Sequence, residues 1–364
     1  IDSRVSFLSL GGECRSVIGC RLTPLQKAKL VSIVKKGTMD MNVSVEEGGR
    51  EGVLTLAIGD GANDVPMIQE AHVGIGIFGK EGNQAANQAD FAIAQFRDLR
   101  RLMLIHGRSD YISQVGVCLY CLHKNMVLTL TLFWYSYYTS MSGTSLYESW
   151  IYSAFNLALG LPIIFYGILD KDLNQKFVLD NPQVYETSRS NSQLSLQAMF
   201  GWFINGLVYA TIICCLSYIA FSEVFQFQAL YIMGTTVWTG LVMSLQGKIF
   251  TMSHHWSWPQ ASCMVLSIAL MFPYFIFASV SNYSFYHQAV MLFTQWDFWL
   301  LGMLVIPFVT VVLSDVITMT FMNLWYPTNE QLYKEYAYSD IFNGDTWTQF
   351  AALLRHNVRC IDKD

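Results

Sequence analysis

Long apolar stretches with almost no charge dominate the chain after Arg108, whereas the residues before Arg108 mix charged, polar and apolar positions. A helix needs about 20 apolar residues to cross the hydrocarbon core of a bilayer. The apolar pattern predicts helical spans at residues 116–139, 149–169, 198–222, 227–247, 260–281 and 298–321. We therefore predict a cytosolic region at 1–110, six transmembrane helices within 111–321 and a cytosolic tail at 322–364.

The positions of Lys and Arg predict the orientation of these spans, because basic residues concentrate in the cytosolic loops of membrane proteins. The loops at 140–148, 223–226 and 282–296 contain neither Lys nor Arg, so we place them outside the cytosol. The alternative is that the apolar stretches are core helices of a soluble protein. We disfavour it because residues 190–222 are uncharged over too long a distance.

The first hundred residues alternate between helical and strand-like patterns. Apolar runs predict strands at 16–20, 53–58 and 73–77, and helices at 23–34 and 83–87. In the first helix, Thr23 is the expected N-cap and Pro24 the first helical residue. This alternation is typical of a doubly wound parallel sheet, in which chemistry collects at the carboxyl ends of the strands. Residues 37–52, rich in Gly, Met and Glu, are interpreted as a flexible surface insertion.

A pair of carboxylates follows the predicted strand at 53–58. The strand delivers Asp60 to the edge of the sheet, two glycines allow a sharp turn, and Asp64 lies four residues further on at the start of a helix. Mg2+ is usually held by one or two carboxylates together with phosphate oxygens and water. We predict a Mg2+ site at Asp60 and Asp64, the alternative being a turn that carries solvated acids.

A lysine in the first turn of the helix at 23–34 is a candidate phosphate-binding group. The charge of Lys27 would add to the N-terminal amides of the helix, and both stabilise a phosphoryl group. Lys29 lies two residues further on. For either lysine, a solvated helix charge is the alternative interpretation.

Six stretches of the chain carry a resemblance to a known family. Three resemble late phosphorylation-domain motifs of P-type ATPases: Thr23-Pro24-Leu25-Gln26-Lys27-Ala28, Gly59-Asp60-Gly61-Ala62-Asn63-Asp64-Val65-Pro66-Met67-Ile68 and Ala71-His72-Val73-Gly74-Ile75-Gly76-Ile77. Three more are similar to the type IV, phospholipid-transporting subfamily, the flippases: Glu81-Gly82-Asn83-Gln84-Ala85, Asp90-Phe91-Ala92-Ile93-Ala94-Gln95-Phe96 and His106-Gly107-Arg108-Ser109-Asp110-Tyr111. The motifs cover the chain from about Cys14 to Leu173, and beyond that only hydropathy agrees.

The resemblance implies a fold, a reaction and a set of site residues. It implies a haloacid-dehalogenase-like phosphorylation domain and an ATP-driven translocase that moves phospholipid toward the cytosolic leaflet through an aspartyl-phosphate intermediate. Mg2+ is the implied cofactor, ATP the substrate of the complete protein, and a glycosylated accessory β-subunit the implied partner. By the same resemblance, Asp60 coordinates Mg2+, Asn63 and Asp64 position that site, and Lys27 holds the aspartyl phosphate.

The chain also departs from the family pattern. It contains no Asp-Lys-Thr-Gly-Thr string, so the phosphorylated aspartate is missing, as are the nucleotide-binding domain, the actuator domain and the first four spans. We expect a C-terminal fragment of a longer protein that cannot turn over ATP alone. The alternative is a degenerate flippase-like scaffold or regulatory module of a larger protein, as in some protist guanylyl cyclases. The upstream sequence would distinguish the two by the presence or absence of that aspartate.

Polar residues inside the first two predicted spans are candidates for a transport path. Lys124 and Asn125 interrupt the first span, and Lys124 lies about 12 Å into it at 1.5 Å per residue, which makes it a functional candidate. The family has a matching Lys-Asn pair that is thought to line the lipid-headgroup path. The alternative is a lysine satisfied by a carbonyl of a neighbouring helix. In the second span, Asn156 and Pro162 resemble family positions, although the spacing is one residue shorter.

Acidic residues are scarce in the predicted spans. The second span contains no carboxylate between Glu148 and Asp170, which disfavours a cation pump, since such a pump needs carboxylates to hold its ion. Asp315 in the last span is interpreted as a lone structural acid near the cytosolic end, and Lys248 as a cytosolic loop residue beyond the fourth span.

Composition agrees with a membrane protein. The chain is 53% hydrophobic and only 13% charged, which is too apolar for an ordinary soluble protein. The formal net charge of -5 and the lack of a basic cluster argue against nucleic acid as a partner. We expect an integral, multi-pass protein of the plasma membrane or an endomembrane.

Overall fold

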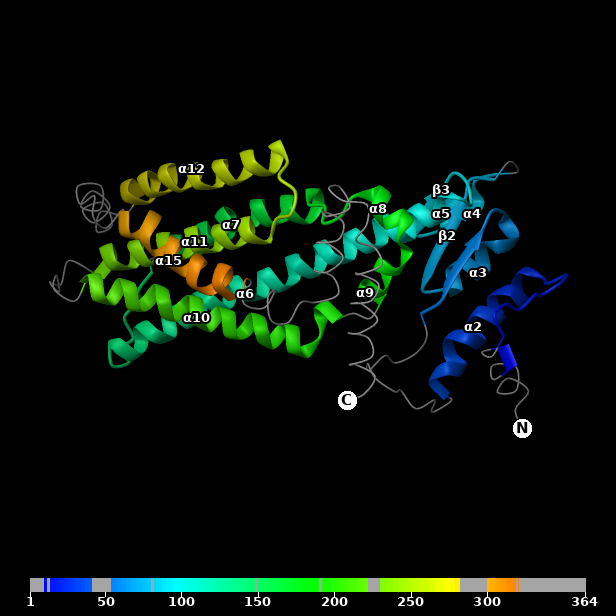
Figure 1. The fold of residues 1–364 in the computed structure, drawn as a ribbon, viewed down its shortest axis with the longest axis horizontal. Helices are drawn as coiled ribbons and strands as arrows, with labels where there is room; N and C mark the ends of the chain where they lie inside the picture. Colours follow the sequence, from blue (N-terminus) through cyan, green and yellow to red (C-terminus); the bar gives the residue numbers. More distant parts are fainter. Residues whose placement is uncertain are drawn as a thin grey trace, which may run out of the picture. The chain divides into compact units, whose positions relative to one another are not determined.

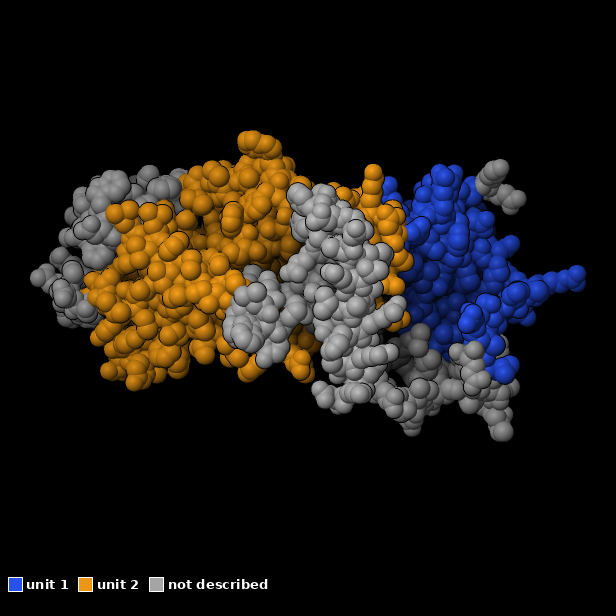
Figure 2. Space-filling model, in the orientation of Figure 1, with its two compact units in different colours: residues 1–105 blue, residues 106–364 orange. Residues whose placement is uncertain are grey.

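The computed structural model describes residues 10–11, 14–40, 54–79, 82–147, 149–189, 192–221, 230–281, 300–318 and 320. The chain divides into two compact units, residues 1–105 and residues 106–364 (Figure 2). The predicted tail at 322–364, the loops at 223–226 and 282–296, and residues 41–52 of the predicted insertion lie outside the described residues.

The first unit contains a three-stranded parallel sheet in the order β1-β2-β3. The strands are β1 (Leu56–Gly59), β2 (Val73–Ile77) and β3 (Phe91–Ile93). The helical elements are α2 (Pro24–Asp40), η1 (Ala62–Asp64), α3 (Val65–Glu70), α4 (Gln84–Gln88) and α5 (Asp98–Arg101), with α3 and α4 on the connections between successive strands (Figure 1). Parallel neighbours joined through helices are the alternating α/β arrangement that the sequence predicts.

Several predicted elements are confirmed. Strand β2 occupies the predicted residues, and β1 begins three residues later than expected. Helix α2 begins at Pro24, and the backbone N–H of Thr23 donates to Oε1 of Gln26 at 2.9 Å, as in a capping box. The helix continues to Asp40, so the first residues of the predicted insertion are helical.

Two features of the first unit differ from expectation. The strand predicted at 16–20 is wrong: these residues are exposed and irregular, and Arg21 follows them with a φ of 56°. A strand needs a neighbour to accept its ladder hydrogen bonds, and no described strand pairs with this segment. Strand β3 was not predicted because its three residues are too few for a recognisable pattern.

The second unit is built of long helices that lie roughly along one direction (Figure 1). They are α6 (Arg108–Tyr138), α7 (Ser149–Leu169), α10 (Leu196–Phe221), α11 (Leu230–Met252), α12 (Trp258–Ser281) and α15 (Ile306–Val311), the last flanked by the π-helical stretches η6 (Leu301–Val305) and η7 (Val312–Val316). Shorter elements connect α7 to α10: α8 (Gln175–Asp180), η3 (Pro182–Val184), α9 (Tyr185–Arg189) and η4 (Ser192–Leu194).

Helix α11 lies at the centre of this unit. It contacts α6, α7, α10 and α15, and its side chains Trp238, Leu241 and Leu245 are fully buried in the main apolar core. Among the described helices, those at Asp98–Tyr138 and Leu196–Phe221 are long and apolar enough to cross a bilayer. The first of these runs through α5, the π-helical stretch η2 (Leu102–Gly107) and α6 without a break.

The position of Lys248 corrects one prediction. Helix α11 extends to Met252, so Lys248 is a helical residue with only 4% of its surface exposed rather than a loop residue beyond the span. The predicted span ended before Lys248 because a charged residue interrupts the apolar pattern. The partner that neutralises this charge, Asp315, lies 67 residues away in η7 and is not visible in the local sequence.

Candidate functional site

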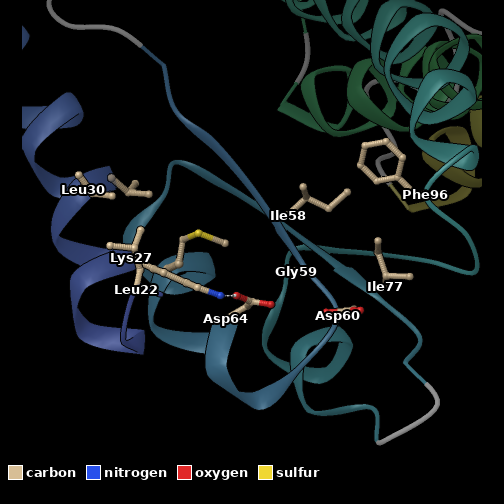
Figure 3. Close-up of a pocket in the computed structure, with 11 residues that line it drawn as sticks. Leu22, Lys27, Leu30, Ile58, Gly59, Asp60, Asp64, Ile77 and Phe96 are labelled. Atoms are coloured by element: carbon tan, nitrogen blue, oxygen red, sulfur yellow. Dashed lines mark hydrogen bonds and ion pairs between the residues drawn. The ribbon is translucent and has the colours of Figure 1, made fainter. Parts of the chain in front are cut away.

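A pocket of about 500 Å3 lies at the carboxyl edge of the sheet in the first unit (Figure 3). Asp60 directly follows β1, and Asp64 ends η1, so the turn after one strand supplies both carboxylates. Helix α2 supplies Lys27 from its first turn. The remaining lining is mainly apolar: Leu22, Leu30, Val31, Ile58, Gly59, Met67, Ile77 and Phe96. The three charged groups predicted from the sequence are thus brought to one pocket.

Lys27 and Asp64 form an ion pair at the rim of this pocket. The Nζ of Lys27 donates to Oδ1 of Asp64 at 2.7 Å, with side-chain exposures of 32% and 13% (Figure 3). The pair depends on close packing at Gly59, because a Cβ at that position would lie 2.3 Å from the Cβ of Asp64. Only glycine therefore lets the strand end against this carboxylate.

The other predicted residues of this site differ in placement. Asp60 lines the pocket and is exposed, and the one contact drawn among the lining residues in Figure 3 joins Lys27 to Asp64. Asn63 and Lys29 are exposed, and neither lines the pocket. Of the two candidate lysines, Lys27 is therefore the one at the site.

The side chains of the pocket fit a magnesium site in which the protein supplies only one or two of the ligands. Among the described residues, no three His, Cys, Asp or Glu side chains are grouped as a complete metal cage would require. Mg2+ commonly takes only one or two protein carboxylates and completes its shell with phosphate oxygens and water. Asp60, with its exposed carboxylate beside the Lys27–Asp64 pair, fits that requirement.

In the second unit, Lys124 and Asn156 join α6 to α7. The Nζ of Lys124 donates to Oδ1 of Asn156 at 3.2 Å and lies 5.6 Å from the ring centroid of Phe155. Lys124 is buried, with 8% of its surface exposed. Its ammonium group contacts a side-chain amide and a ring face, not the helix carbonyl of the alternative interpretation. Two of the three predicted path residues, Lys124 and Asn156, are therefore in contact.

Asn125 does not take part in this contact. It is exposed, and its recorded hydrogen bond is made by its backbone carbonyl, which accepts from Oγ1 of Thr129 at 2.9 Å. Consecutive residues of a helix point about 100° apart, so Asn125 lies on a different face of α6 from Lys124.

A buried charge pair in the second unit was missed in the sequence analysis. The Nζ of Lys248 donates to Oδ1 of Asp315 at 2.9 Å and to Oδ1 of Asn205 at 2.8 Å. Tyr209 donates its hydroxyl to the other oxygen of Asp315, and the rings of Trp202 and Tyr209 lie 4.7 and 5.2 Å from the ammonium group. Asp315 is therefore not the lone acid that was predicted. The sequence did contain a signal for this pair, because Lys248 and Asp315 are opposite charges that each stand alone in an apolar stretch.

Comparison with known proteins gives a consistent picture. A family model described as "Phospholipid-translocating P-type ATPase C-terminal" matches residues 86–328. The chain is 33% identical over 371 aligned positions to "Probable phospholipid-transporting ATPase 5" of Arabidopsis thaliana, covering 98% of this chain and 29% of that protein. It is 35% identical over 345 positions to "Phospholipid-transporting ATPase DNF1" of Saccharomyces cerevisiae, covering 92% of this chain and 21% of that protein.

The chain thus spans less than a third of the length of these relatives. The family match covers more than half of the chain and includes all the long helices of the second unit. The chain therefore belongs to the phospholipid-transporting P-type ATPases, the type IV subfamily, and contains the C-terminal region of that family.

Proposed function

We propose that the chain is the C-terminal part of an ATP-driven phospholipid translocase that works through an aspartyl-phosphate intermediate and moves phospholipid toward the cytosolic leaflet. The observation that carries the transport role is the contact between Lys124 and Asn156. It places a cation and an amide between two helices, of which α6 contains no carboxylate after Asp110 and α7 contains none. Such a pair suits a polar lipid headgroup better than a metal cation, which needs carboxylate ligands.

The first unit would be part of a haloacid-dehalogenase-like phosphorylation domain. Lys27 would hold the phosphoryl group of the aspartyl phosphate, which upstream sequence must provide. Asp64 would orient Lys27 through their 2.7 Å contact, Asn63 would support the turn, and Asp60 would hold Mg2+. The metal would neutralise charge on the phosphate oxygens. The chain alone would not hydrolyse ATP.

The second unit would cross the membrane six times, through α6, α7, α10, α11, α12 and the helical segment around α15. The first unit would lie in the cytosol, as the distribution of basic residues indicates. The complete protein would reside in the plasma membrane or an endomembrane with a glycosylated accessory β-subunit.

The test uses the full-length protein that contains this chain, with Lys124→Ala compared to Lys176→Ala, an exposed lysine of α8. We expect Lys124→Ala to lower lipid-stimulated ATP hydrolysis about tenfold and to raise the lipid concentration for half stimulation, because a hydrogen bond to a charged group contributes about 1.5–3 kcal/mol. Phosphorylation from ATP should persist. An unchanged lipid response in folded Lys124→Ala protein would remove Lys124 from the transport path.

A further inference from the structure

The residues Arg108 and Asp172 form a buried ion pair that the proposed site does not use. Nη1 of Arg108 donates to Oδ1 of Asp172 at 3.0 Å, and Nη2 donates to Oδ2 at 2.6 Å. Arg108 is 1% exposed and Asp172 is 9% exposed. Two parallel bonds from a planar guanidinium fix both distance and orientation. The first turn of α6 is thereby fixed to the segment that follows α7.

The neighbouring Asp170 fastens the same segment at a second point. Its Oδ1 accepts backbone N–H groups of His254 at 3.0 Å and of His255 at 2.9 Å, and its Oδ2 lies 3.2 Å from Nδ1 of His254. These histidines lie on the connection from α11 to α12. Residues 170–172 therefore join three parts of the second unit: the start of α6, the end of α7 and the α11–α12 connection.

The pairs Arg108–Asp172 and Lys124–Asn156 both connect α6 to α7 or to the segment that follows α7. Lys124 follows Arg108 by 16 residues, and Asn156 precedes Asp172 by the same number. Along α6 this separation is about 24 Å at 1.5 Å per residue. Two contacts so far apart on packed helices oppose sliding and rotation of one helix against the other.

The stretch just before Arg108 has a different backbone. Residues Leu102–Gly107 are π-helical, and the division between the two units falls within them, after Ile105. Short π-helical turns inside α-helices are rare and frequently occur at functional sites. Arg108 is the first α-helical residue after this turn, so the fixed part of α6 begins where the irregular part ends.

We propose that Arg108 and Asp172 act as a latch that makes α6 and α7 move together, so that a movement entering through residues 102–107 reaches Lys124 and Asn156 at once. Both are positioning residues, since neither lies in the phosphate pocket or contacts Lys124. The proposal rests on the proposed function, because the movement it transmits would couple phosphorylation to the lipid path. Breaking one partner of such a pair leaves a buried charge uncompensated, whereas exchanging the two charges restores the pairing.

The experiment compares Arg108→Gln, Asp172→Asn and the double exchange Arg108→Asp with Asp172→Arg in the full-length protein. The control is Arg189→Gln, whose side chain pairs with Glu186 at 69% and 71% exposure. Phosphoenzyme formation from ATP and lipid-stimulated dephosphorylation are measured on equal amounts of folded protein. We expect the phosphoenzyme level of the single variants to stay within twofold of the wild-type level. Their lipid-stimulated dephosphorylation should fall at least tenfold. The double exchange should recover most of that loss.

Two outcomes with the single variants would overturn the latch. Single variants with a normal lipid response would do so, and so would equal losses of phosphorylation and lipid response, which indicate general damage. If the single variants do not fold, Arg108→Lys decides, because it keeps the charge and loses the two-pronged geometry. A wild-type lipid response in that variant would also overturn the latch. A wild-type protein that phosphorylates without lipid stimulation would instead overturn the proposed function.

Discussion

Lys27 and Asp64, which lie 37 residues apart in the sequence, form a 2.7 Å ion pair at the pocket that Asp60 also lines. The pair holds the ammonium group of Lys27 at the carboxyl edge of the sheet, although the lysine comes from a helix that precedes all three described strands. In the proposed function, this arrangement would place a cation beside an anionic group bound at the same edge.

The contrast between Lys27 and Lys29 gives a direct test of this arrangement. In the full-length protein, Lys27→Met should lower the steady-state phosphoenzyme level at least tenfold, because the phosphoryl group loses a fixed cation. Lys29→Met, on an exposed face of the same helix, should stay within twofold of wild type. Labelling with radioactive ATP followed by acid quench measures both. Equal effects of the two substitutions would contradict the assignment of Lys27.

Gly59 and Gly61 provide a matched pair for the packing of the turn. A Cβ on Gly59 would overlap Asp64, whereas a Cβ on Gly61 meets no atom within 4 Å, and the φ of Gly61 is -130°. We expect Gly59→Ala to lower the free energy of unfolding by about 1–3 kcal/mol, as overpacking does. Gly61→Ala should change it by less than about 0.5 kcal/mol. Denaturant titration followed by intrinsic fluorescence gives both values, and comparable losses would show that Gly59 is not constrained by Asp64.

The pair of Lys248 and Asp315 should behave as a coupled unit. Lys248→Met or Asp315→Leu alone should destabilise the protein by about 3–5 kcal/mol, since each leaves a buried charge without its partner. The double substitution should cost clearly less than the sum of the two, which a double-mutant cycle measures as a coupling energy. Thermal unfolding in detergent supplies the comparison. Strictly additive losses would mean that the two charges do not interact.

Labelling of introduced cysteines tests the orientation of the helices. Ser142 is an exposed residue between α6 and α7, and Arg189 ends α9 between α7 and α10. In intact cells, an impermeant maleimide should label Ser142→Cys but not Arg189→Cys, and permeabilisation should expose the second. The parent protein without either substitution measures the background from native cysteines. The reverse pattern would invert the proposed topology.

The fold was predicted best where a single local pattern determines the element. Val73–Ile77 is continuous and apolar, and Thr23, Pro24 and Gln26 together start α2, so β2 and α2 appear where expected. Residues 16–20 are equally apolar but have no described strand to pair with. Whether an apolar run becomes a strand depends on its neighbours in space, which local composition does not reveal.

Within the candidate sites, single residues were easier to predict than their partners. The turn from Gly59 to Asp64 identifies itself by its glycines and carboxylates, and Lys124 stands out in an apolar helix. The contacts of Lys248 and Asp315 were missed because each charge, considered alone, looks like the end of a span or an isolated acid. Their mutual neutralisation depends on how α10, α11 and η7 pack, and that packing has no local signature.

The same pair has a consequence for biosynthesis. A ribosome completes α11 before it makes the segment that contains Asp315, so for that interval Lys248 has no carboxylate to neutralise it. In the proposed six-span topology, a lone lysine within α11 disfavours stable residence of that helix in the lipid. Helix α11 would then insert stably only after η7 has been made, so synthesis of the segment that contains Asp315 would complete the insertion of α11. Nascent chains stopped before residue 315 should accordingly be recognised by membrane quality control and degraded.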